Sequence, residues 1–191
     1  MRSLILLMHV SLDGFTAGPN GEMDWIRFDD ELIDDVTELT ASADTALYGR
    51  VTYQMMEGYW PTAADSPTAS QHDIDHGRWV NQSLKLVFSR TLERADWQNT
   101  QIVRDDIPAE LARIKQRPGK NLLMIGSPST ARTFTRLGLI DEYWINVNPV
   151  VLGSGIPLFA SSADRVDLQL VSSKLYASGV VGLRYRRAPT E

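Results

Sequence analysis

The chain alternates short apolar runs with amphipathic helical patterns over almost its whole length, and this alternation restricts the fold more than any other feature. Short apolar runs bounded by turn residues predict buried strands, whereas apolar residues spaced three and four apart predict helices. The expected strands are Leu4–Val10, Thr45–Tyr48, Lys85–Phe88, Gln101–Val103, Asn121–Ile125, Tyr143–Val151, Leu168–Tyr176 and Val180–Arg186. The expected helices are Asp30–Ala43, Val51–Gly58, Ser70–Gln82, Pro108–Gln116 and Pro128–Leu137. This order is typical of an α/β domain.

The last two expected strands follow each other without a helix between them. Only Ala177–Gly179 separates them, so they are expected to form an antiparallel hairpin. We therefore predict a three-layer fold in which a mostly parallel central sheet ends in this hairpin and carries helices on both faces. The 191 residues show no internal repeat, and the polar stretch Pro61–Ser70 is too short for an interdomain linker. The prediction is a single domain over residues 1–191.

Composition excludes several classes of function. The chain has no cysteine, which rules out disulfides, thiolate zinc sites and a cysteine nucleophile. The formal net charge of −5 argues against a general nucleic-acid binder. His72 and His76 lie four residues apart without an acid at matching spacing, so no metal site is expected. The apolar run Leu4–Val10 is far shorter than the roughly 20 residues that a membrane helix needs, so we expect a cytoplasmic protein without membrane contact.

Three of the expected strands end in sequences that suit phosphate groups. The segments are Leu47–Thr52, Lys85–Thr91 and Leu122–Thr130. Ligands of open α/β sheets bind at the carboxyl ends of the strands, where such segments meet. Each segment alone is also typical of an ordinary turn or a capped helix, and neither a G-x-G-x-x-G nor a Walker A motif is present. Their joint occurrence favours a nucleotide site.

The three segments would contribute different groups to such a site. Gly49 lets a ligand approach the backbone closely, and Arg50 adds a guanidinium. Ser89 and Arg90 offer a hydroxyl beside a guanidinium, a pair that suits a phosphate monoester. Ser127 is expected to cap the next helix, whose free N–H groups attract anions.

Asp29 precedes the first expected helix and has two interpretations. It projects onto the apolar side of that helix, unlike the other acids nearby. In the first interpretation it is an N-cap, with Phe28 and Ile33 as the flanking hydrophobic staple. In the second it is an acid at the mouth of a pocket, with a pKa raised by desolvation so that it can transfer a proton. The two interpretations are compatible.

The order of these segments resembles the dihydrofolate reductase-like family, and within it the reductase domain of the bacterial bifunctional riboflavin-biosynthesis deaminase-reductase. The similar segments are Ser11–Ala17, Gly21 with Asp24–Trp25, Leu47–Tyr53, Lys85–Leu92, Gly138–Tyr143 and Pro149–Phe159. The last two resemble the riboflavin branch specifically, which disfavours a true dihydrofolate reductase. One departure follows the fifth expected strand, where the family has Gly-Gly and this chain has Gly126 and Ser127. Because the zinc site of the deaminase needs cysteine, we expect a stand-alone reductase domain.

The resemblance implies that the chain binds NADPH. The implied contacts are Arg50, Ser89 and Arg90 for the adenosine phosphates, Gly126, Ser127, Ser129 and Thr130 for the pyrophosphate, Gly49 and Thr52 in the same site, and the backbone of Thr16 and Ala17 for the nicotinamide carboxamide. The protein would orient the cofactor and exclude water, and the hydride chemistry would belong to the cofactor.

On the substrate side, the resemblance places a catalytic acid near Asp29 or Asp30, and the helical projection favours Asp29. Asp13 either shapes its loop or hydrogen-bonds a substrate. Trp25 is expected to be a wall of the substrate site or else a buried core aromatic. His9, inside the first strand, is expected to be a core histidine with satisfied hydrogen bonds.

The expected function is that of an NADPH-dependent oxidoreductase that transfers a hydride to a small heteroaromatic or carbonyl substrate, pterin-like or pyrimidine-like. The alternative is a nucleotide-binding or dimerisation module that keeps the fold without catalysis, because fold alone does not define function. The strand Tyr143–Val151 and the terminal hairpin carry aromatic residues such as Trp144 and Tyr185. Relatives of this type pair through their sheets, so a homodimer is expected.

Overall fold

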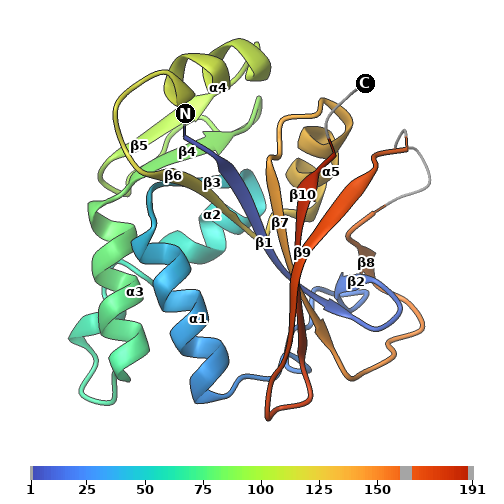
Figure 1. Cartoon of the computed structure of the whole chain (residues 1–191). Coiled ribbons are helices and arrows are strands. Elements are labelled where there is room, and N and C mark those ends of the chain that lie inside the picture. Colours follow the sequence, from blue (N-terminus) through green and yellow to red (C-terminus); the bar gives the residue numbers. More distant parts are fainter. Residues whose placement is uncertain (1, 160–164, 189–191) are drawn as a thin grey trace.

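The computed structural model describes residues 2–159 and 165–188, and an eight-stranded sheet forms its centre (Figure 1). The strands are β1 (Leu4–Ser11), β2 (Phe15–Ala17), β3 (Ala43–Gly49), β4 (Leu84–Phe88), β5 (Thr100–Val103), β6 (Asn121–Ile125), β7 (Glu142–Asn148), β8 (Ile156–Pro157), β9 (Leu168–Leu175) and β10 (Val181–Arg187). The helices are α1 (Asp30–Ala41), α2 (Arg50–Glu57), α3 (Gln71–Gln82), α4 (Ile107–Lys115) and α5 (Pro128–Arg136), with a 3-10 turn, η1, at Ala63–Asp65.

The strand order of the sheet is β5-β4-β3-β6-β1-β7-β10-β9. Strand β10 runs antiparallel to both of its neighbours, and the other pairs in this sheet are parallel. Strands β2 and β8 form a separate antiparallel pair. The mostly parallel sheet and the C-terminal hairpin are therefore confirmed.

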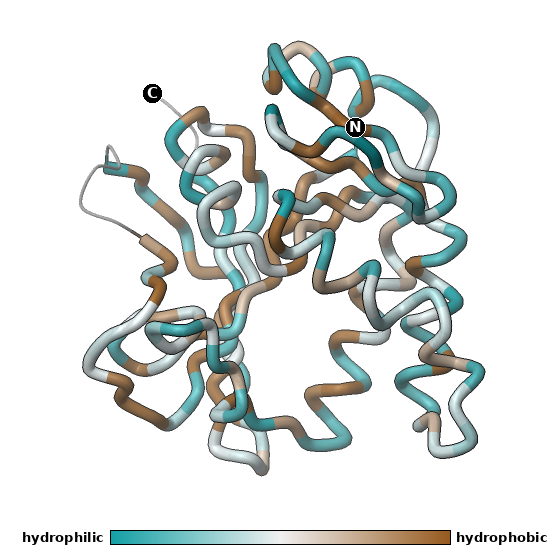
Figure 2. The backbone as a smooth tube through the Cα atoms, turned by 180° about the vertical axis from the view of Figure 1, so that it is seen from behind, coloured by the Kyte–Doolittle hydropathy of each residue, from teal (hydrophilic) through white to brown (hydrophobic). Residues whose placement is uncertain are grey.

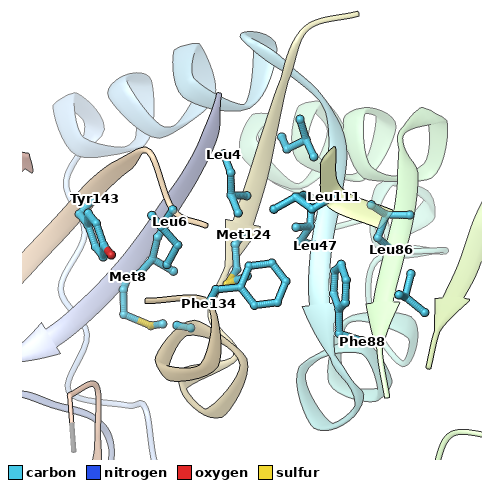
Figure 3. Packing of buried hydrophobic residues seen from close by; sticks show 14 of the residues in the cluster. Leu4, Leu6, Met8, Leu47, Leu86, Phe88, Leu111, Met124, Phe134 and Tyr143 are labelled. Atoms are coloured by element: carbon cyan, nitrogen blue, oxygen red, sulfur yellow. The ribbon is translucent and has the colours of Figure 1, made fainter. Parts of the chain in front are cut away.

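Alternate residues of β1 explain why helices cover both faces of the sheet. Leu4 and Leu6 point to the face where Phe134 of α5 and Leu111 of α4 pack (Figure 3). Ile5 and Leu7 point to the opposite face, which α1 covers. Figure 2 shows the hydrophobic residues concentrated in the central strands. A strand buried on both faces is a near-continuous apolar run, which is why the sequence predicts these strands well.

The element boundaries differ from expectation where local chemistry decides them. The first helix ends at Ala41, two residues early, because Ala43 already belongs to β3. The strand expected to reach Val151 ends at Asn148, since the next residue is a proline, which lacks the N–H that a ladder needs. Strands β2 and β8 were not expected, because they have two or three residues and no apolar run. Within Pro61–Ser70 the structure forms η1.

A buried histidine on α3 makes stability sensitive to acid. His76 packs between Trp60 and Trp79, with ring centroids 4.2 and 5.2 Å away. Burial lowers the pKa of His76 to about 3 and that of His9 to about 4. The unfolded chain therefore binds more protons than the folded chain below about pH 6.5. The free energy of unfolding is therefore highest above about pH 6.5. It falls by about 1.4 kcal/mol per pH unit for each histidine as the pH drops toward the pKa of that histidine in the folded chain.

This acid sensitivity is measurable by urea unfolding at pH 7 and pH 5. We expect wild type to lose stability between these two values. A His76→Phe variant, which keeps an aromatic ring but cannot be protonated, should lose about 2 kcal/mol less over the same interval. An identical loss in both proteins would contradict the assignment.

Candidate functional site

The ends of β3 and β6 meet in a tight cradle. The N–H of Gly49, at the end of β3, donates a hydrogen bond to Ser127 Oγ at 2.7 Å. A Cβ atom on Gly49 would lie only 2.3 Å from Thr130 Oγ1. A Cβ atom on Gly126 would lie 3.4 Å from the methyl group of Thr52. The structure thus brings together five residues that the sequence assigns to cofactor binding.

The backbone between β6 and α5 turns through two consecutive left-handed residues. Gly126 has φ of 68° and Ser127 has φ of 61°. Ser127 occupies the N-cap position of α5, but its side chain makes no capping hydrogen bond, which corrects the expectation that its hydroxyl caps the helix. The hydroxyl is turned toward Gly49 instead. The first N–H groups of α5 are thereby left without a side-chain cap, and such groups bind anions.

Substitutions of Ser127 separate two effects on stability. A serine in the left-handed region costs about 1–2 kcal/mol, which glycine avoids. Both Ser127→Gly and Ser127→Ala remove the acceptor for Gly49 N–H, but only the alanine variant keeps the backbone strain. We expect the alanine variant to be less stable than the glycine variant by about 1–2 kcal/mol in urea unfolding. Equal stability of the two variants would show that this turn carries no strain.

A groove of about 540 Å³ lies at the ends of β4 and β5 and meets this cradle at Thr130. Its polar lining includes Ser89, Arg90, Arg104, Asp105, Asp106, Ser129, Thr130, Thr133 and Arg136. The groove therefore joins the second and third phosphate-type segments. Arg50 is exposed at the first turn of α2 and does not line this groove.

Arg104 and Arg136 were missed by the sequence analysis. Arg104 directly follows β5, where a charged run resembles an ordinary solvated loop, and Arg136 ends α5. The only available signal was that β5 is another parallel strand whose carboxyl end reaches the same edge of the sheet.

The arginines of the groove hold each other in place. Arg90 Nε donates to the carbonyl oxygen of Arg104 at 3.4 Å, and Arg104 Nη1 donates to that of Arg90 at 3.5 Å. Arg104 Nη2 donates to the carbonyl oxygen of Glu93 at 3.3 Å. Arg90 also lies 3.6 Å from the exposed Asp105 carboxylate, whereas Arg104 has no carboxylate partner within the described part of the chain. The charge of Arg104 is therefore available to an anionic ligand.

Asp13 fastens the loop after β1 to the segment after β7. Its carboxylate accepts hydrogen bonds from Ser11 Oγ at 2.6 Å, from Leu152 N at 3.1 Å and from Gly153 N at 2.7 Å. The bond from Ser11 contributes most to lowering the pKa of Asp13. The structure thus shows the loop-shaping role that was one of the two expected for Asp13.

The same two segments meet again at the β2–β8 pair. Thr16 Oγ1 donates to the carbonyl oxygen of Ile156 at 2.9 Å, and both Thr16 and Ala17 are buried. Gly155 approaches so closely that a Cβ atom there would lie 2.2 Å from the carbonyl oxygen of Ala17. The segments Ser11–Ala17 and Pro149–Phe159, both similar to the family, are therefore joined to each other beside β1.

Asp29 is an N-cap, as one of its two interpretations predicted. Its carboxylate accepts from Leu32 N at 2.8 Å and from Ser178 N at 2.7 Å, so it joins α1 to the hairpin. These bonds, led by the one from Leu32, lower the pKa of Asp29. The raised pKa expected for a proton donor is not found, because hydrogen bonds to the carboxylate outweigh desolvation. Its role as a catalytic acid stays a prediction.

Trp25 and His9 both differ from ordinary core residues. Trp25 is half-buried, and its Nε1 donates to the carbonyl oxygen of Glu22 at 3.0 Å, so it is not a buried core residue. His9 departs from the expectation of satisfied hydrogen bonds, because its Nδ1 is buried without a partner among the described residues.

The described residues form neither a membrane-spanning helix nor a cluster of metal ligands. Within residues 2–159 and 165–188, no helix is both long and apolar enough to cross a membrane. The same residues contain no group of three or more His, Cys, Asp or Glu placed to hold a metal ion.

The sheet order, the antiparallel hairpin and the strand-end site define a dihydrofolate reductase-like α/β protein. Residues 2–182 match the model of the RibD C-terminal domain, and the chain belongs to this family.

The chain is similar to several bacterial proteins and solved structures. It is 37% identical over 184 residues, covering 96% of this chain and 94% of the relative, to the uncharacterized protein YyaP of Bacillus subtilis. A putative riboflavin biosynthesis protein from Shewanella sp. PV-4 has the same fold, with a TM-score of 0.77 at 22% identity over 98% of this chain and all of that one. The diaminohydroxyphosphoribosylaminopyrimidine deaminase/5-amino-6-(5-phosphoribosylamino)uracil reductase of Thermotoga maritima has a TM-score of 0.67 at 15% identity, over 98% of this chain and 57% of that one.

Proposed function

We propose that the chain is an NADPH-dependent reductase that transfers a hydride to a small heteroaromatic substrate of the pyrimidine type. The observation that carries this proposal is that the Gly49–Ser127 cradle and the arginine-lined groove meet at Thr130, at the carboxyl ends of the parallel strands. The similarity to the Thermotoga maritima enzyme, named as a uracil reductase, supports a pyrimidine as the substrate class. A pterin-like or carbonyl substrate fits the same site chemistry.

The residues present fit the cofactor. Glycine at position 49 lets the end of β3 pack directly against Thr130, because a Cβ atom there would lie 2.3 Å from Thr130 Oγ1. The start of α5, whose N–H groups have no side-chain cap and would bind a diphosphate, therefore lies beside the end of β3. Gly126, Ser127, Ser129 and Thr130 would hold the pyrophosphate, and Arg50, Ser89, Arg90 and Arg104 would surround the adenosine phosphates. The backbone of Thr16 and Ala17 would orient the nicotinamide carboxamide. The cofactor, when bound, supplies the hydride, and the chain orients both reactants and excludes water.

Isothermal titration with NADPH tests this proposal directly. We expect saturable binding below millimolar concentration, followed by NADPH oxidation when pyrimidine, pterin and carbonyl compounds are screened as substrates. Absence of NADPH binding at millimolar concentration would overturn the proposal.

The lowered pKa of Asp29 favours a second candidate function. With this carboxyl ionised at neutral pH, the chain could be a nucleotide-binding or dimerisation module that lacks catalysis. In that case NADPH would bind, but no compound in the screen would oxidise it. Turnover of any compound would exclude this alternative.

The outer strand β9 is the surface through which we propose a homodimer. It is the last strand of the sheet, and Leu170, Val171 and Leu175 on it are 52%, 51% and 73% exposed. An exposed apolar edge strand is a template for pairing with another chain. Sedimentation at micromolar concentration should show a dimer for wild type and a monomer for a Leu170→Lys/Val171→Lys variant. A monomeric wild type would contradict the dimer.

A further inference from the structure

His9 lies next to the proposed cofactor site without being part of it. On β1, the carbonyl oxygen of Leu7 accepts a hydrogen bond from Gly126 N at 3.3 Å, so the phosphate-binding turn abuts the strand at that residue. His9 follows two residues later, about 7 Å further along, on the same face of the strand as Leu7. Strand β6 ends at Ile125, which pairs with Leu7. Beyond Leu7, strand β1 therefore has a neighbouring strand only on its β7 side. The imidazole therefore lies on the face of the sheet that α1 covers, next to Phe28 in the segment before that helix.

The two ring nitrogens of His9 make few hydrogen bonds within the described part of the chain. Its Nδ1 is buried and has no hydrogen-bond partner among the described residues. Its Nε2 has one long contact, 3.5 Å from Nδ2 of Asn146, the residue paired with it in register on β7. A buried polar atom left without a partner destabilises the fold by about 1–3 kcal/mol. An unpartnered nitrogen beside a candidate site is therefore explained by a ligand that hydrogen-bonds to it.

An exposed aromatic side chain lies against His9. The ring of Phe28 lies 5.1 Å from the imidazole, tilted by 53°. Phe28 is 55% exposed and belongs to the connecting segment before α1. The Nδ1 atoms of His72 and His76 also lack partners, but there the cover differs, because Trp60 and Trp79 enclose His76 inside the helical layer. Of the three histidines, all within the described residues, His9 is the one on a strand of the sheet, and its unpartnered nitrogen lies beside an exposed aromatic ring.

We infer that His9 contacts the substrate, with a free imidazole nitrogen hydrogen-bonding the polar edge of a planar heteroaromatic ring that stacks against Phe28. This inference rests on the proposed function and assigns to it a specificity residue. Asn146, beside His9, offers its side-chain amide as a second hydrogen-bonding group to the same ring edge. A neutral imidazole carries one donor and one acceptor, so it complements a ring that presents an amide-like edge and discriminates against purely apolar rings.

Histidine-selective NMR tests this assignment on the wild-type chain. The sequence has three histidines, so ¹⁵N-histidine labelling gives three imidazole spin systems. With NADP⁺ present, 6-aminouracil is added as the probe. We expect a saturable shift of the His9 nitrogens, while those of His72 and His76 stay in place. A probe that binds without shifting His9 would overturn the inference.

Variants give an independent measurement. Replacing His9 by Phe should weaken the probe about tenfold, because the hydrogen-bonding nitrogen is lost. His9→Gln, which keeps a hydrogen-bonding amide, should restore part of the affinity, and His72→Phe is the matched control with no expected effect. NADPH affinity should be unchanged in all three. If NADPH binds but 6-aminouracil does not, or if 6-aminouracil binds wild type and His9→Phe equally, the assignment of His9 is wrong and the proposed function stands. If neither NADPH nor 6-aminouracil binds, the proposed function is wrong as well.

Discussion

An Arg90→Ala/Arg104→Ala variant is expected to bind NADPH about 100-fold more weakly than wild type, while its affinity for NADH changes little. The two guanidinium groups lie in the groove and are fixed against each other through their carbonyl groups. Each hydrogen bond to a charged group contributes about 1.5–3 kcal/mol, and contacting residues do not add fully. The extra phosphate of NADPH is the group that two such guanidiniums would recognise.

Isothermal titration of both cofactors at fixed salt measures this difference. Arg78→Ala is the matched control, because Arg78 is an exposed arginine on α3 that pairs with Asp75 outside the groove. Its affinity for both cofactors should equal that of wild type. An equal loss of NADPH and NADH affinity in the double variant would show that these arginines bind another part of the cofactor or none of it.

Gly155→Ala is expected to destabilise the chain by about 2–5 kcal/mol and to abolish turnover, whereas Gly153→Ala should cost only about 1–2 kcal/mol. Both glycines have positive φ, of 154° and 76°, so both substitutions strain the backbone. They differ in their surroundings. A Cβ atom on Gly155 would meet the carbonyl oxygen of Ala17 at 2.2 Å, whereas one on Gly153 would have no atom within 4 Å.

The clash at Gly155 forces β8 away from β2, and β2 carries the backbone that would orient the nicotinamide. Urea unfolding measures the stability of the two variants, and NADPH titration at a temperature where both are folded measures the site. Gly153→Ala should bind NADPH as wild type does. If Gly155→Ala binds NADPH and turns over normally, the β2–β8 unit has no part in the site.

Some features of the chain follow from local patterns, and these were predicted from the sequence. The central strands are buried on both faces, so each is a continuous apolar run that no surface segment would show. The helix expected over Ser70–Gln82 is α3, which the structure begins at Gln71 after a capping box of Ser70 and Asp73. The glycine and hydroxyl residues at the ends of β3, β4 and β6 were recognisable because ligands of such sheets bind at strand ends.

Features that depend on long-range contacts were not predictable. Lys85 stands in a segment that resembles the cofactor motifs, yet its side chain is fully buried. Its Nζ donates to the carbonyl oxygens of Val80 and Ser83 and lies 4.6 Å from the Trp97 ring centre. The N–H of Ser178, from the far end of the chain, is one of the two donors that lower the pKa of Asp29.

By itself, the sequence determined the α/β class, the hairpin and the strand-end segments that form the proposed site, because periodicity and turn residues act over a few neighbouring positions. Only the tertiary structure decided which of these residues meet. It placed Arg104 in the groove, turned Ser127 toward Gly49 and left Nδ1 of His9 without a partner among the described residues. The physical reason is that burial, pKa and hydrogen-bond satisfaction depend on groups that are distant along the chain and are brought together only by folding.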